Sequence, residues 1–253
     1  MVQAKFEKLS VFFPMWNEEQ YFQRALNAAE DICVELQKSQ TIADYELLII
    51  DDASTDSTPQ LADAAAARDS RVKVVHHQTN RKLGGSIKSG FSAATGDVVL
   101  YTDADLPFDM CEVHNAIRLM NQYEADIVSA YRFDRTGEGY VRVVYSMFYN
   151  LMVRILFGVR FRDINFAFKL CRKSVFDQIT LESEGSFIDA ELIISAKKRN
   201  LSVVQFGVDY FPRTRGVSTL SSPSVIVKIL REAFKLRKKL NAIRPVDVAG
   251  SVK

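Results

Sequence analysis

The 253-residue sequence has few cysteines, almost no net charge and no long apolar run. Its three cysteines, Cys33, Cys111 and Cys171, are far apart and form no CxxC pair, which suits a reducing compartment and predicts buried thiols. The formal net charge of +2 argues neither for nor against an anionic partner. The first ten residues lack the apolar segment of a signal peptide. Two arginines interrupt the most apolar stretch, residues 141–159, so no uncharged run approaches the roughly 20 residues that a membrane span requires. These absences predict a cytoplasmic protein, soluble or attached to a membrane from one side.

Short apolar runs alternate with helical stretches along the chain, at an ordinary globular composition of 47% apolar and 25% charged residues. The pattern predicts strands at residues 9–13, 45–50, 72–76, 98–102, 126–130, 165–171 and 203–211. It predicts helices from Asn17 to about residue 37, from Asp56 or Ser57 to 68, and at 85–95, 141–158, 188–198 and the C-terminus. This alternation indicates an α/β fold with a largely parallel central sheet flanked by helices. With no repeat, linker or low-complexity tract, we expect a single domain over residues 1–222, and a basic amphipathic helix and tail over 223–253 packed on or next to it.

Polar clusters follow three of the predicted strands, at residues 14–18, 51–56 and 103–105. In an open α/β sheet the carboxyl ends of the strands form the edge where ligands bind. Three separate regions of sequence are therefore expected to meet at one crevice, which is a stronger signal than any of the three clusters alone.

Asp103 and Asp105 form a DxD pair directly after an apolar strand. Two carboxylates at this spacing can bind a hard divalent cation that itself holds phosphate oxygens. One alternative is a capped turn before the helix that follows Pro107. Another is the aspartyl-phosphate nucleophile of a phosphatase, but Pro107 stands where that motif has Thr or Val.

Two further segments suit a nucleotide. Asp52 can accept hydrogen bonds from a base or ribose, although residues 54–57 also read as a helix cap. Residues 80–86 place two glycines and two cations before a helix, where backbone N–H groups can face phosphate, a pattern that is also common in ordinary turns. His76, His77 and His114 have no metal-ligand spacing and are expected to have surface or loop roles.

Together these segments resemble the family 2 glycosyltransferases of GT-A fold, a Rossmann-like α/β architecture. FPMWNEE (13–19), DDASTDST (51–58), NRKLGGSIKSGFSAATGD (80–97) and YTDADLP (101–107) are similar to that family's successive motifs. Arg132, Arg142 with Ser146, DINFAFK (163–169), FIDAEL (187–192) and RTRGVS (213–218) resemble the dolichol-phosphate mannosyltransferase and polyprenyl-phosphate glycosyltransferase branch. The likeness extends over roughly residues 9–220, in order and at similar spacing.

The resemblance implies a role for each matching position. The nucleotide pocket would be lined by Pro14, Trp16, Glu18, Ile50 and Asp52. The metal and diphosphate would be bound at Asp103, Ala104 and Asp105. The acceptor phosphate and donor diphosphate would be bound by Arg132, Arg142, Ser146 and Arg213. Two departures remove family contacts: Pro107 replaces a frequent Gln or Ser, and Thr219 replaces the usual Lys.

The predicted function is inverting transfer of a sugar from a GDP- or UDP-sugar to a polyprenyl phosphate with Mg²⁺ or Mn²⁺, and no nucleic-acid partner is expected. A phosphate acceptor is already anionic, so it needs cations more than a base. A saccharide or other hydroxyl acceptor would need a base, for which Asp189 or Glu191 are the candidates unless both are structural. A non-catalytic nucleotide-sugar-binding protein is a further alternative.

Residues 225–244 carry seven Lys or Arg against one acid, Glu232. Their apolar stripe, Ile226, Ile229, Ala233, Leu236, Leu240 and Ile243, has helical spacing typical of core or partner packing. The basic face also favours peripheral contact with the cytoplasmic face of an anionic membrane.

Overall fold

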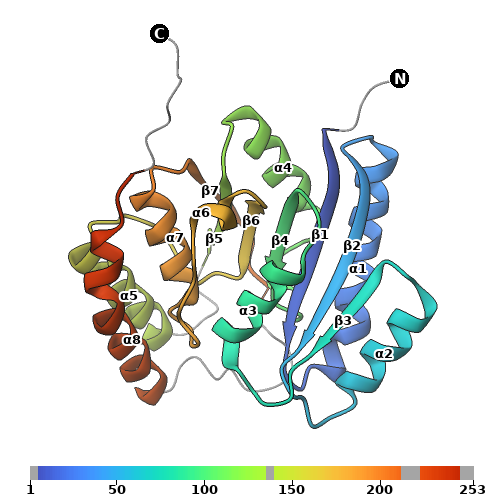
Figure 1. Ribbon diagram of the computed structural model, residues 1–253, viewed down its shortest axis with the longest axis horizontal. Coiled ribbons are helices and arrows are strands. Elements are labelled where there is room, and N and C mark those ends of the chain that lie inside the picture. Colours follow the sequence, from blue (N-terminus) through green and yellow to red (C-terminus); the bar gives the residue numbers. More distant parts are fainter. Residues whose placement is uncertain (1–4, 135–139, 212–222, 246–253) are drawn as a thin grey trace.

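The computed structural model describes residues 5–134, 140–211 and 223–245 (Figure 1). The strands are β1 (Phe6–Met15), β2 (Ile42–Asp51), β3 (Val72–His76), β4 (Val98–Thr102), β5 (Ile127–Arg132), β6 (Phe168–Arg172) and β7 (Val203–Val208). The helices are α1 (Glu19–Lys38), α2 (Thr58–Arg68), α3 (Lys82–Ala93), α4 (Glu112–Gln122), α5 (Tyr140–Phe157), α6 (Val175–Gln178), α7 (Ile188–Lys198) and α8 (Pro223–Ala242).

The strands form one seven-stranded sheet in the order β3-β2-β1-β4-β6-β5-β7. Every neighbouring pair is parallel except the two that involve β6, which runs antiparallel to β4 and β5. The central strands are near-continuous apolar runs because both of their faces are covered by helices. The predicted α/β class with a largely parallel sheet is therefore confirmed.

Helices cover both faces of the sheet (Figure 1). Side chains of α1, α2 and α4 pack on one face around Val11, Phe13 and Leu100. Side chains of α3, α5, α7 and α8 pack on the other face around Phe12 and Tyr101. The central strands are thus buried on both faces, and a ligand can approach them at the strand ends.

The last helix packs against this second core. Ile229, Ala233, Leu236 and Leu240 are buried there, and Ile243 is partly buried. From Ile229 onward the apolar stripe of α8 is therefore used for packing, as the core alternative predicted, while Phe234 and most of the basic residues face solvent. The side chain of Ile226 lies outside the described residues. Within the described ranges, no helix is both long enough and apolar enough to cross a membrane.

Several helices and strands begin or end at residues other than those predicted. Asn17 does not cap α1, which begins at Glu19, because Asn17 adopts a positive φ of 56° and its side chain binds the β2–α2 loop instead. The third helix starts at Lys82, three residues earlier than predicted, and β7 ends at Val208 instead of 211. The sixth strand begins at Phe168, because the residues before it form a turn closed by Asp163.

Candidate functional site

The polar clusters meet at the carboxyl edge of the sheet, the lower edge in Figure 1. β1 lies between β2 and β4, so the chain order reverses direction between β1 and β4. This is the kind of position at which open α/β sheets form a ligand crevice. Pro14 and Ile50 lie in the last two residues of β1 and β2, Trp16 and Asp52 come directly after those strands, and Asp103 comes directly after β4. The predicted convergence of the three strand ends is confirmed.

The segments after β1 and β2 are tied together by hydrogen bonds. Asn17 N donates to Ser54 Oγ at 3.0 Å, and Thr55 N donates to Asn17 Oδ1 at 2.7 Å. Glu18 N donates to Thr58 Oγ1 at 3.0 Å. These bonds fix the two loops without covering Trp16, whose side chain is half exposed. An exposed indole held on a rigid loop is well placed to stack on a planar ligand.

Asp52 is buried and anchors the loop after β3. Its Oδ1 accepts a hydrogen bond from Arg81 N at 2.7 Å and lies 2.7 Å from His77 Nδ1. The His77 side chain is only 5% exposed, and its Nε2 lies 2.9 Å from Ser89 Oγ. Of the predicted surface or loop roles, His77 therefore has the loop role, with a buried side chain that follows β3 directly. Asp52 orders the crevice wall in addition to any contact that it makes with a nucleotide.

The glycine pair in the first turn of α3 serves close packing. Gly84 N donates to Glu184 O at 3.0 Å, and a Cβ at Gly84 would lie 2.4 Å from Ser183 O. The peptide N–H that the phosphate-loop interpretation needs is already used, so that interpretation was wrong for Gly84. His76 is the last residue of β3. Its pKa is raised chiefly by its hydrogen bond to Asp51, at 2.8 Å.

The DxD pair follows β4 on a constrained turn. Tyr101 stacks on Phe12 with ring centroids 5.5 Å apart, and its hydroxyl donates to Asp103 Oδ1 at 3.5 Å. Burial, together with the nearby Asp103, raises the pKa of Tyr101 well above its usual value, so the phenol remains a donor. Ala104 is buried, whereas Asp103 and Asp105 are partly exposed at the edge of the sheet.

These two carboxylates suit a hard divalent cation, because Mg²⁺ and Mn²⁺ prefer oxygen ligands and keep positions open for substrate oxygens. Among the residues that the structure describes, no cluster of three or more His, Cys, Asp or Glu could bind a metal through protein ligands alone.

Arg132 ends β5 in a strongly constrained setting. Its Nε and Nη2 each lie 2.6 Å from a different oxygen of Asp163, a bidentate pair, and its guanidinium lies over the rings of Phe166 and Tyr210. Asp163 has a positive φ of 45°. Such strain, of order 1–3 kcal/mol, persists only where the surroundings enforce it. The guanidinium is thus held in one orientation.

Arg132 lies in the wall of an open cavity of about 780 Å³. The apolar part of the wall includes Phe133, Met147, Leu151 and Phe161. Its other charged residues are Arg154, Arg160, Arg162 and Asp163. Ser146 is half-buried on α5. Arg142 belongs to the same helix, but its side chain lies outside the described residues, as does Arg213 entirely.

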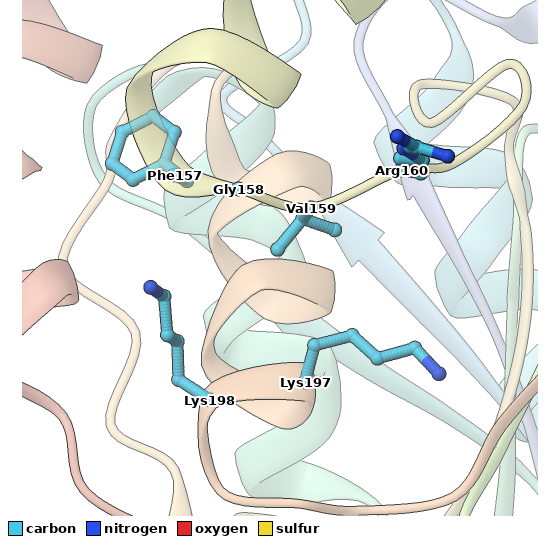
Figure 2. A pocket seen from close by; sticks show the side chains of 6 residues that line it. All are labelled: Phe157, Gly158, Val159, Arg160, Lys197 and Lys198. Atoms are coloured by element: carbon cyan, nitrogen blue, oxygen red, sulfur yellow. The ribbon is translucent and has the colours of Figure 1, made fainter.

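Figure 2 shows a second, smaller hollow of about 230 Å³, between the end of α5 and the last turn of α7. Phe157, Gly158, Val159 and Arg160 line its upper side in this view, and Lys197 and Lys198 line its lower side. None of the predicted site residues lines this hollow. The larger cavity with Arg132 is therefore the one that bears on the predicted chemistry.

The two candidate bases have different surroundings. Glu191 is buried and accepts hydrogen bonds from Glu182 N at 2.8 Å and Ser183 N at 2.7 Å, one on each oxygen. This supports the structural alternative for Glu191. Asp189 is also buried, with Lys169 Nζ 3.5 Å from its Oδ1. Burial raises the pKa of Asp189, and Lys169 opposes that rise.

Sequence reasoning missed several residues of this site. Lys169 is fully buried in β6 and donates to Phe166 O at 2.5 Å. A cation inside an apolar strand was the available signal, because such a charge needs a buried partner. No local sequence pattern predicts the contact of Asp163 with Arg132, because the two residues are 31 positions apart.

Comparisons with known proteins agree with this geometry. Residues 10–180 match the Glycosyl transferase family 2 profile. Glycosyltransferase AglD of Haloferax volcanii is 30% identical over 212 residues, which are 81% of this chain and 33% of that protein. Undecaprenyl-phosphate 4-deoxy-4-formamido-L-arabinose transferase of Pseudomonas fluorescens is 29% identical over 221 residues, 86% of this chain and 62% of the relative. The chain thus spans a third to under two thirds of the length of these relatives.

A solved structure shares the fold. Glucosyl-3-phosphoglycerate synthase of Mycobacterium tuberculosis, in complex with Mn²⁺, UDP-glucose and phosphoglyceric acid, superposes with a TM-score of 0.67 at 16% identity. The match covers 98% of this chain and 84% of that one. This likeness confirms the predicted GT-A architecture. The profile match over residues 10–180 shows the family. The chain belongs to glycosyl transferase family 2.

Proposed function

We propose that the chain transfers a sugar from a nucleoside-diphosphate sugar to a polyprenyl phosphate, with a divalent metal bound at Asp103 and Asp105. The observation that carries the proposal is the cavity at the end of β5. Its wall combines the fixed guanidinium of Arg132 with apolar side chains such as Met147 and Leu151. A phosphate monoester attached to a long apolar chain matches both parts of that wall.

The donor is assigned to the crevice over β1, β2 and β4. Pro14, Trp16, Glu18, Ile50 and Asp52 would hold the nucleotide there. The metal would supply positive charge for the diphosphate that leaves. UDP-glucose and Mn²⁺ are bound to the Mycobacterium tuberculosis enzyme of the same fold. Thermal unfolding with a panel of nucleotide sugars distinguishes a GDP-sugar donor from a UDP-sugar donor for this chain.

In the reaction, an oxygen of the acceptor phosphate forms a bond to the anomeric carbon as the bond from that carbon to the donor diphosphate breaks. The acceptor is already ionised, so no proton has to be removed from it. Arg142 and Arg213, with Ser146, would hold this phosphate and the departing diphosphate, since guanidinium groups bind such oxygens in pairs. Arg132 pairs its Nε and Nη2 with Asp163, so it would add to this site through the rest of its guanidinium. The hydroxyl of Tyr101 donates to Asp103 and would help to orient this carboxylate toward a metal.

A panel of nucleotide sugars tests the donor half of the proposal. Thermal unfolding should shift upward with one GDP- or UDP-sugar only when Mg²⁺ or Mn²⁺ is present, because a ligand that binds the native state stabilises it. Asp105→Ala should abolish both the metal-dependent shift and transfer while the unliganded protein keeps its melting temperature. Full activity of Asp105→Ala in excess chelator would contradict the metal assignment.

Arg142 tests the acceptor half. If the acceptor is a prenyl phosphate, Arg142→Ala removes a charge-assisted contact and should lower kcat/KM by on the order of 10²-fold. Hydrolysis of the donor by water does not use that contact and should change little. Arg142→Lys should restore only part of the activity, because an ammonium cannot reproduce a bidentate grip. Equal loss of transfer and donor hydrolysis in Arg142→Ala would contradict this role.

A further inference from the structure

The outer face of α5 is apolar and exposed. Its stripe, defined as Val144, Met147, Phe148, Leu151 and Ile155, recurs at helical spacing, and these side chains are 46–71% exposed. Among the described residues, half of the large apolar side chains that are strongly exposed belong to this one helix. The inner face of α5 is buried through Val153 and Phe157, so the helix is apolar on both sides. Such an unpaired stripe marks an interaction surface.

Cations border the stripe. Arg154 is exposed within it, and Arg160 and Arg162 follow the end of the helix. Asp163 is the one acid that lines the adjoining cavity within the described ranges, and it is paired with Arg132. α8 lies beside α5 (Figure 1), with its apolar stripe buried and basic residues such as Arg237 and Lys238 exposed.

The stripe is continuous with the cavity at the end of β5. Met147 and Leu151 belong to both the stripe and the cavity wall, and Arg132 lies in the same wall. An apolar chain that extends along these two residues would keep apolar contact while its headgroup reached the guanidinium. The stripe from 144 to 155 is roughly 17 Å long at the helical rise, long enough to lie along a membrane surface.

We propose that the outer face of α5 docks on the surface of an anionic lipid bilayer, and that lipid acceptors enter the Arg132 cavity from there. The second half rests on the proposed function, since only a lipid acceptor needs that route. A bilayer offers hydrocarbon to the stripe and negative headgroups to the arginines at once. A second copy of the chain fits less well, because a twofold interface uses the same patch on both copies and would add further arginines instead of negative charges.

Vesicle binding by the full chain tests the docking surface. Phe148→Gln and Ile155→Gln change stripe residues that do not line the cavity. Each should lower the partition coefficient onto phosphatidylcholine–phosphatidylglycerol vesicles by roughly tenfold, since each removes one apolar side chain from the lipid contact. Tyr123→Gln is the matched control, because Tyr123 is also a large exposed side chain, at 56%, but lies at the end of α4. It should bind vesicles like the wild type. Vesicles of phosphatidylcholine alone should bind the wild type more weakly.

Unchanged vesicle binding by Phe148→Gln and Ile155→Gln would overturn the proposal. So would a wild-type dimer in sedimentation analysis that Phe148→Gln dissociates, because the stripe would then be an interface between copies. Transfer to a short, water-soluble prenyl phosphate separates this proposal from the proposed function. If that transfer fails while the stripe variants lose vesicle binding, the docking surface stands and the lipid-phosphate acceptor falls. If that transfer succeeds while the wild type does not bind vesicles, the docking surface is refuted and the proposed acceptor is retained.

Discussion

Asp189→Asn should unfold the protein more easily while sparing the chemistry of the molecules that remain folded. Asp189 and Lys169 are both buried, and the carboxylate lies 3.5 Å from the ammonium. The substitution leaves the Lys169 charge in the core, where its ammonium donates a hydrogen bond to the carbonyl oxygen of Phe166 at 2.5 Å. Removing one partner of a buried ion pair costs about 3–5 kcal/mol of unfolding free energy.

Urea unfolding followed by fluorescence measures this cost. With a denaturant slope of about 2–3 kcal/mol per molar urea, the midpoint should fall by roughly 1–2 M. The double variant Lys169→Met, Asp189→Leu should regain most of the loss, because it removes both charges and keeps the volume apolar. This pattern would establish the pair as structural.

Transfer per folded molecule is the second readout. A phosphate acceptor needs no base, so Asp189→Asn should keep most of its specific activity at a temperature well below its melting point. An Asp189→Asn variant with wild-type urea stability and no transfer would refute the reasoning. Combined with a nearly wild-type Arg142→Ala, it would favour a hydroxyl acceptor that Asp189 deprotonates.

Three further predictions concern the crevice and its frame. Asp52→Ala should weaken nucleotide binding by about 1–3 kcal/mol in calorimetry if Asp52 contacts the nucleotide; unchanged affinity together with a lower melting temperature would restrict Asp52 to anchoring His77 and the loop. Burial alone would raise the pKa of Glu46, but Lys73 and hydrogen bonds from Ser10 and Thr95 outweigh it and lower that pKa to about 2. Glu46 should therefore contribute about 3 kcal/mol of stability that is fully present above pH 4.5 and lost as the pH falls toward 2, and Glu46→Gln should flatten this dependence in urea titrations. Gly84→Ala should destabilise the protein by about 1–3 kcal/mol, because its Cβ would meet the backbone of Ser183, and an unchanged melting temperature would contradict that contact.

The parallel sheet and the meeting of three strand ends were predictable, because both follow from local patterns. Apolar runs that end in Pro14, Asp52 and Asp103 must share an edge once the strands are parallel. The core position of the α8 stripe was likewise foreseen as the commoner outcome of its spacing. Residue spacing does not predict which of the two helices, α5 or α8, exposes its apolar stripe. In the structure the stripe of α5 is exposed and that of α8 is buried from Ile229 onward.

The remaining features depend on contacts between distant residues. Asn17 looked like a helix cap, but its side chain accepts a hydrogen bond from Thr55, 38 residues away. Gly84 looked like part of a phosphate loop, but the segment at 183–184 takes up that space and its N–H. His77 and Lys169 became buried because Asp52 and Asp189 face them across the fold. Single-sequence patterns do not encode such pairings.

Transfer of labelled sugar to polyprenyl phosphate in phosphatidylcholine–phosphatidylglycerol vesicles tests the central claim most directly. The chain is incubated with the GDP- or UDP-sugar that stabilises it, with Mn²⁺ or with chelator, and the label is followed into the organic extract. The account predicts a lipid-phosphate sugar that forms only with metal and is lost in Asp105→Ala. Label that enters a water-soluble saccharide instead, or a lipid product that forms equally in chelator, would contradict it.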